Sequence, residues 1–182
     1  IANAERVSIK TVCEEGEQHE RIIDLADAEN YDLIVMGRRG LRRLEKVLLG
    51  SVTAKVIGYS HTDVLVVPRD TEVGWQRALV ATDGSKYSEA ASKKARDFAK
   101  SYGGELKILS VVDVHPEFYA ESPKTVDELI KKAKGYVEDI RKQSESEGIK
   151  AETFVREGET YQKITELAKE QNVGTIVMGS HR

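Results

Sequence analysis

This chain of 182 residues has one cysteine, no long apolar run and no strong net charge. Cys13 alone cannot form an intrachain disulfide, which fits a reducing compartment. No run approaches the ~18 apolar residues of a membrane span, and the first residues lack the pattern of a signal peptide. A net charge of −3 does not favour nucleic acid or an anionic membrane as a partner. We therefore expect a cytoplasmic protein that binds neither.

Patterns typical of catalytic and metal sites are also missing. His19, His61, His115 and His181 have no ligand spacing, and no position suggests a Ser–His–Asp or Cys–His pair. The Gly-Lys-Ser/Thr ending of a Walker loop is absent. We expect no catalytic residues of these kinds and no metal site built from histidine and cysteine.

An internal repeat organises the chain. Residues 11–37 align with residues 153–179 at an offset of 142, and 12 of the 27 positions are identical. This offset is the size of a domain. We therefore predict that residues 1–70 are the C-terminal half of one domain and residues 71–76 a linker. Residues 77–182 would be the N-terminal part of a second domain, without its last helix and strand.

Apolar runs alternate with amphipathic segments along both parts. The expected strands are Ser8–Val12, Asp32–Met36, Asp63–Val67, Ala78–Thr82, Leu106–Asp113, Ala151–Arg156 and Thr175–Met178. The expected helices are Glu17–Glu29, Val47–Tyr59 (beginning as late as Gly50), Ser88–Tyr102, Thr125–Ser146 and Thr160–Gln171. This alternation predicts an α/β fold of parallel βαβ units, with five strands in each complete domain.

The most informative motif is a glycine-rich loop that runs from Gly37 through Gly40 to Gly50-Ser51. It joins an expected strand to an expected helix. Glycines let the backbone approach an anion closely, and the helix N-terminus favours negative charge. The loop therefore predicts phosphate binding. Its basic residues either attract phosphate or form a solvated face: Arg38, Arg39, Arg42, Arg43 and Lys46.

Other strand ends carry candidate ligand contacts, because open α/β sheets bind ligands at the carboxyl ends of strands. Asp83, in the segment Ala81-Thr82-Asp83-Gly84-Ser85, can contact ribose or a phosphate-bound Mg²⁺, or it can simply shape a helix-capping turn. Val111-Val112 can cover an adenine or be plain core. Met36-Gly37, repeated as Met178-Gly179, can pack on a base or fill the core.

These motifs resemble the universal stress protein family. Its ATP-binding members carry Gly-x2-Gly-x9-Gly-Ser/Thr, which Gly37, Gly40, Gly50 and Ser51 match. The segments 64–68, 81–85 and 111–112 are also similar to the family. The resemblance implies a tandem of Rossmann-like nucleotide-binding domains, each with a five-stranded parallel sheet of order 3-2-1-4-5.

The resemblance further implies that ATP or AMP is bound, with Mg²⁺ at Asp83. The nucleotide-binding residues that it implies are Met36, Gly37, Gly40, Gly50, Ser51, Val52, Thr53, Ala81, Thr82, Asp83, Val111, Val112, Met178 and Gly179. The phosphate loop falls in the first part of the chain, and the adenine half falls in the second. We therefore expect two half-sites.

The leading hypothesis is an adenine-nucleotide-binding regulatory or stress-response protein with at most weak ATPase activity. The alternatives are an ATP-dependent enzyme of the same α/β class, by adenylyl transfer or slow hydrolysis, and an interaction domain without nucleotide. Strand 63–67 is expected at the edge of its sheet, where Val64 and Val66 would be exposed. The resemblance implies that this edge pairs two domains or two protomers.

Overall fold

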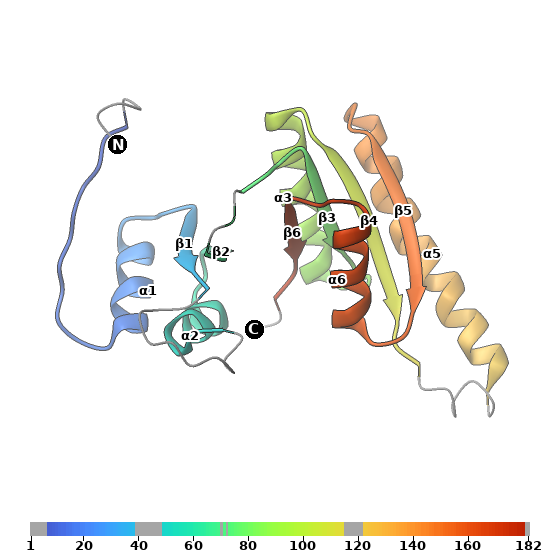
Figure 1. Cartoon of the computed structure of the whole chain (residues 1–182), viewed down its shortest axis with the longest axis horizontal. Helices are drawn as coiled ribbons and strands as arrows, with labels where there is room; N and C mark the ends of the chain where they lie inside the picture. The colour runs from blue at the N-terminus through green and yellow to red at the C-terminus, as the bar shows by residue number, and fades with distance from the viewer. Residues whose placement is uncertain (1–6, 39–48, 70, 72, 115–121, 181–182) are drawn as a thin grey trace. The chain divides into compact units, whose positions relative to one another are not determined.

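The computed structural model describes residues 7–38, 49–69, 71, 73–114 and 122–180. The chain divides into two compact units, one within residues 1–71 and the other within residues 72–181 (Figure 1). Each unit is an α/β structure with its own parallel sheet. Among the described residues, no helix has both the length and the apolar character needed to cross a membrane.

The first unit is a small two-layer structure. Its elements are α1 (Gln18–Ala28), β1 (Leu33–Gly37), α2 (Ser51–Tyr59) and β2 (Asp63–Val67). The two strands are parallel, with Ile34 opposite Val64. Ile34 packs with Ala26 of α1 and Val56 of α2, so both helices share one face of the sheet. Val35 points to the other face by strand alternation, and 61% of it is exposed.

The strand expected at Ser8–Val12 is absent, so that prediction was wrong. Residues 7–15 have no regular structure, and Val7, Ile9 and Val12 are 57%, 64% and 46% exposed. The repeat aligns this segment with the start of β5 (Ala151–Glu157), which pairs with β4 (Glu105–Val112) in the second unit. The described part of the first unit holds no counterpart of β4. Without a partner strand, the backbone groups of this segment have no ladder to join.

The second unit contains the larger sheet. Its remaining elements are β3 (Arg77–Ala81), α3 (Lys86–Tyr102), α5 (Pro123–Ser146), α6 (Thr160–Glu170) and β6 (Thr175–Met178). The four strands are parallel and follow the order β5-β4-β3-β6. Along the chain, the strands are added on one side of β3, as β4 and then β5, before β6 is added on its other side. The topological switch point therefore lies between β3 and β6.

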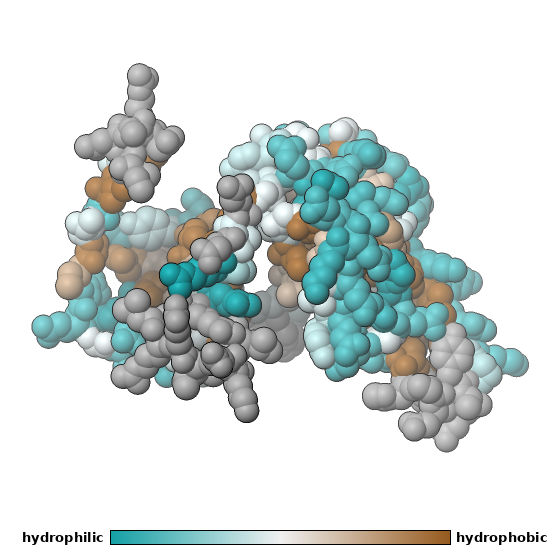
Figure 2. Space-filling model, viewed as in Figure 1, coloured by the Kyte–Doolittle hydropathy of each residue, from teal (hydrophilic) through white to brown (hydrophobic). Residues whose placement is uncertain are grey.

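Helices cover both faces of this sheet. Ala78 and Val80 of β3 pack with α3 and α5 on one face, in a cluster that includes Ala95 and Val137. Leu79 points to the opposite face, where Ile164 and Leu167 of α6 cover it. Strand residues alternate between the two cores, as expected for a sheet buried on both faces. Figure 2 shows hydrophilic side chains over most of the visible outer face of α6.

Aromatic stacking fixes the segment that leads into β3. The Trp75 ring stacks on Phe98 of α3, with centroids 4.4 Å apart, and also on Tyr102 at 5.8 Å. A Cβ at Gly104 would collide with the carbonyl oxygen of Trp75, so the backbone is tightly packed here as well. Trp75 therefore anchors packing in the second unit.

The described sheets have two and four strands, so a sheet of five strands is not present in the part of the chain that the structure describes. The order β5-β4-β3-β6 places the third, second, first and fourth strands of its unit side by side. The complete order 3-2-1-4-5 and the tandem organisation stay predictions. The repeat does recur locally: α1 and α6 begin and end 142 residues apart, and the aligned Asn30 and Asn172 have φ of 52° and 49°.

Every other expected element is present. Their ends lie within two residues of the expected ones, except that α2 begins at Ser51 and residues 47–48 lie outside the described part.

Candidate functional site

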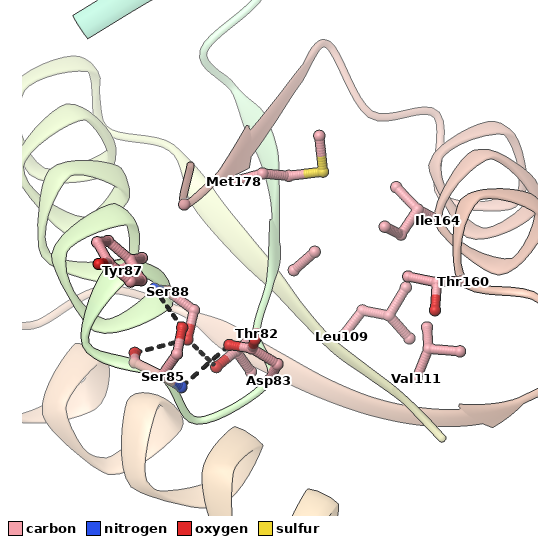
Figure 3. A pocket seen from close by; sticks show the side chains of 12 residues that line it. Thr82, Asp83, Ser85, Tyr87, Ser88, Leu109, Val111, Thr160, Ile164 and Met178 are labelled. Carbon is pink, nitrogen blue, oxygen red and sulfur yellow. Dashed lines mark hydrogen bonds between the residues drawn. The ribbon is translucent and has the colours of Figure 1, made fainter. Parts of the chain in front are cut away.

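A cavity of about 410 Å³ opens at the carboxyl ends of β3, β4 and β6, at the switch point of the larger sheet (Figure 3). Its lining divides by polarity. Thr82, Asp83, Ser85, Tyr87 and Ser88 form a polar half at the start of α3. Ala81, Leu109, Val111, Ile164 and Met178 form an apolar half, and Thr160 and Gly179 complete the lining. This is the place and the size of a small-molecule site in an open α/β sheet.

Hydroxyl groups hold the turn between β3 and α3 in the polar half. The Thr82 Oγ1 lies 3.0 Å from the Ser88 Oγ and accepts a hydrogen bond from the Gly84 N–H at 3.2 Å. Ser85 is the N-cap of α3, and its Oγ accepts from the Ser88 N–H at 3.3 Å. Figure 3 shows these contacts as a connected network. The network fixes how the turn is presented to the cavity.

Asp83 is the one acidic side chain among the described residues that line the cavity. Its Oδ1 accepts a hydrogen bond from the Ser85 N–H at 3.0 Å. Hydrogen bonds from the Ser85 side chain, and then from the Ser85 backbone, hold the pKa of the Asp83 carboxyl below its ordinary value. Asp83 is therefore an exposed, ionised oxygen acceptor at the rim, able to accept from sugar hydroxyls or to ligate a hard cation.

Met178 and Gly179 bring the end of β6 to the cavity. A Cβ at Gly179 would lie 2.5 Å from the Tyr87 carbonyl oxygen and 2.7 Å from the Ser88 nitrogen. These are backbone atoms of the first turn of α3, so only glycine lets the two segments meet. Met178 is 58% exposed and lies along the apolar half. The close approach sets Met178 across the cavity from α6 (Figure 3).

The structure separates the two valines expected at the second strand end. Val111 lines the cavity beside Leu109 and Ile164. Val112 is only 6% exposed and does not line it. Successive residues of a strand point to opposite faces, so one of the two must face away from the cavity.

The expected phosphate-loop residues lie in the first unit. The Gly50 N–H donates to the Arg38 carbonyl at 2.8 Å, so the two ends of the loop meet in a narrow neck. Thr53 is buried, and its hydroxyl donates to the Gly37 carbonyl at 3.0 Å. Ser51 begins α2. Gly40 lies outside the described residues.

The remaining two first-unit candidates contribute to packing. Val52 and Met36 are partly buried against the cluster of Ala26, Ile34 and Val56. Both residues therefore contribute to the core of the first unit. For Met36, filling the core was one of the two alternatives that the sequence left open.

The cavity brings together six of the candidate residues of the second unit. They are Ala81, Thr82, Asp83, Val111, Met178 and Gly179. Sequence reasoning missed the other six lining residues, which are Ser85, Tyr87, Ser88, Leu109, Thr160 and Ile164. Thr160 begins α6 three residues after the end of β5, so the rule that ligands lie at strand carboxyl ends could have identified it.

The described residues do not form a metal centre on their own. No group of three or more His, Cys, Asp or Glu side chains there is placed to hold an ion. Any cation at Asp83 would need most of its ligands from a bound molecule and from water.

One family model matches the chain along nearly its whole length. The model of the universal stress protein family matches residues 1–68 and again residues 74–182. Among curated relatives, universal stress protein MJ0531 of Methanocaldococcus jannaschii is 33% identical over 116 residues, which are 62% of this chain and 68% of that protein. Universal stress protein MJ0577 of the same organism is 44% identical over 61 residues, or 34% of this chain and 38% of that protein.

Solved structures agree with this match. The crystal structure of a universal stress protein from Archaeoglobus fulgidus superposes with a TM-score of 0.66 at 30% identity. The alignment covers 89% of this chain and 54% of that one, so this chain spans about half of the solved protein. With the cavity at the switch point and the family model matching both units, the chain belongs to the universal stress protein family.

Proposed function

We propose that the cavity of the second unit binds the adenosine part of an adenine nucleotide, ATP or AMP. The observation that carries the proposal is the division of the lining by polarity. A planar base suits the slot between Met178, Val111 and Ile164, which is apolar and open. The ribose hydroxyls suit Asp83, because its ionised carboxylate accepts hydrogen bonds at the polar end.

We place the phosphate contacts of each unit separately, at its glycine-rich loop and at a helix N-terminus. In the first unit, Gly37, Gly40, Gly50 and Ser51 are the proposed phosphate contacts, at the N-terminus of α2. In the second unit, Gly179 begins the corresponding loop. Asp83 supplies one hard oxygen for a Mg²⁺ that the phosphates would hold from the other side. The residues fit Mg²⁺ only as a companion of the nucleotide.

Calorimetric titration of the chain with ATP tests the proposal. We expect saturable binding that Asp83→Asn weakens about 10-fold, equivalent to about 1.4 kcal/mol. Asp97→Asn is the matched control, because Asp97 is an exposed carboxylate of α3 paired with Lys93 and does not line the cavity. Equal affinity in the Asp83→Asn protein, or no heat with wild type, would overturn the proposal.

We further propose that the protein acts by binding rather than by turnover, in a regulatory or stress-response role in the cytoplasm. Among the described lining residues, Asp83 is the only carboxylate, and its lowered pKa makes it a poor proton acceptor. Incubation with ATP should leave the nucleotide largely intact over many binding lifetimes. Rapid release of ADP, AMP or pyrophosphate would favour the ATP-dependent enzyme instead. Failure to bind any nucleotide would favour an interaction domain.

Pairing through β2 is the proposed mode of assembly between domains or protomers. In the described residues β2 pairs with β1 alone, and such an edge is a template for another strand. Val64 and Val66 are partly buried rather than fully exposed, and Val64 packs on the core cluster, so Lys at Val64 would also disturb folding. Leu65→Lys charges the opposite face instead. We expect it to shift sedimentation toward the monomer without unfolding, and an unchanged assembly would contradict pairing through this strand.

A further inference from the structure

We infer that Thr160 selects the base in the cavity by accepting a hydrogen bond from an exocyclic amino group. The inference rests on the proposed nucleotide binding and assigns a specificity role to a residue that sequence reasoning missed. Thr160 is the one polar side chain among the described residues on the α6 side of the cavity, where it adjoins Ile164 and Val111 (Figure 3). A polar group in an otherwise apolar slot is well placed to fix the edge of a base.

The neighbour of Thr160 determines what its hydroxyl can offer. Thr160 Oγ1 donates to Asp113 Oδ2 at 3.4 Å, across the end of β4. A hydroxyl has one proton and two lone pairs. With the proton directed to the carboxylate, the lone pairs of Thr160 remain for the cavity. The hydroxyl therefore acts as an acceptor toward a bound base.

An acceptor at this position distinguishes bases by their hydrogen-bonding edge. An amino group such as the one at position 6 of adenine can donate to Thr160. A base that carries hydrogen at this position leaves the Thr160 lone pairs without a donor. One net hydrogen bond corresponds to roughly a fivefold difference in affinity. The preference should thus be modest in size and specific to the 6-amino group.

Asp113 is the positioning residue in this arrangement, because it acts on the base only through Thr160. An asparagine at position 113 can donate its own amide proton to Thr160 Oγ1. The Thr160 proton is then no longer held away from the cavity. Asp113→Asn should therefore reduce the preference for the 6-amino group while it leaves the apolar walls unchanged.

A matched pair of nucleotides tests the inference directly. ATP and purine riboside 5′-triphosphate differ only by the 6-amino group, and each is titrated calorimetrically into the same protein. We expect wild type to prefer ATP about fivefold. Thr160→Val should bring the ratio close to one, and Thr160→Ser should preserve it. Thr165→Val is the control, because Thr165 lies on α6, donates to the Tyr161 carbonyl and does not line the cavity.

The outcomes separate this inference from the proposed function. If wild type binds neither nucleotide, the proposed function fails and the inference fails with it. If wild type binds both equally, or if Thr160→Val keeps the wild-type ratio, the nucleotide site stands and the role of Thr160 is overturned. A ratio measured within one protein is insensitive to a uniform loss of folded material, so a less stable variant still gives a decisive answer.

Discussion

The ring of Tyr136 lies against the α-carbon of Gly84, on the side where any other residue would carry its side chain. A Cβ at Gly84 would lie 2.5 Å from Cε1 of Tyr136 and 2.7 Å from Cε2. Gly84 also has φ of +76°, a left-handed conformation that side chains disfavour. The turn that presents Asp83 is therefore shaped by its own backbone and closed over by a residue of α5.

Gly84→Ala should destabilise the second unit by about 2 kcal/mol or more. A left-handed non-glycine residue costs roughly 1–2 kcal/mol, and the contact with Tyr136 adds to this. Urea denaturation gives the free energy of unfolding for the variant and for wild type.

The double variant Gly84→Ala with Tyr136→Ala separates these two contributions. Removal of the ring relieves the collision but not the unfavourable φ. Stability should therefore recover only in part relative to the sum of the single variants. Strict additivity of the two single changes would show that the ring and the new methyl group do not collide.

Gly179→Ala should weaken both the second unit and its proposed nucleotide binding. The new methyl group would meet backbone atoms of Tyr87 and Ser88, which cannot move aside as a flexible side chain can. Gly135→Ala is the contrasting control, since a Cβ there meets nothing within 4 Å in the middle of α5. We expect Gly135→Ala to stabilise by roughly 0.5–1 kcal/mol. Thermal melts that rank the two variants in the opposite order would contradict the close packing at Gly179.

Asp83 should make the stability depend on pH on the acid side. Its pKa is lower in the folded protein than its ordinary value of 3.8. The stabilisation is therefore fully present above the unfolded-state value and is lost as the pH falls through the folded-state value. Melting temperatures of wild type and Asp83→Asn should differ most above about pH 4 and converge toward pH 2. A difference that stays constant from pH 6 to pH 2 would contradict the hydrogen bonds from Ser85.

Thr53→Val should destabilise the first unit by about 1 kcal/mol, because it removes the hydrogen bond to the Gly37 carbonyl inside a buried site. Thr53→Ser keeps the hydroxyl and should retain most of the stability. Thr11→Val is a control at an exposed residue without regular structure, and it should have little effect. Chemical denaturation measures all three, and a Thr53→Val protein as stable as wild type would exclude this contact as a support of the loop.

Much of the local structure could be predicted because its causes are local. The runs at 33–36 and 176–178 are short, continuous apolar segments rich in β-branched residues, which favours strands, and both lie in strands. The strand at residues 63–67 was predicted residue for residue. Asp83 reached the cavity for a topological reason, since parallel strands gather their carboxyl ends at one edge.

The failures came from contacts that are distant in the sequence. Residues 8–12 have the composition of a strand, but no described strand pairs with them. The composition of a segment does not show whether a partner strand is present. Thr160 lies far from Asp83 along the chain and reaches the cavity only because α6 crosses the sheet beside β4. Likewise, the sequence does not show which of Val111 and Val112 lines the cavity. That distinction depends on which face of β4 looks toward the cavity.

Trp75 is the only tryptophan of the chain, and its indole ring stacks on Phe98 within the second unit. Intrinsic fluorescence excited at the indole band therefore reports on that unit and is silent about the first. Far-ultraviolet circular dichroism reports the helices of both. Superposing the two signals during one denaturation would reveal whether the units melt as a single cooperative block or one after the other. The packing of one aromatic side chain thus gives this protein a built-in, label-free reporter of half of its architecture.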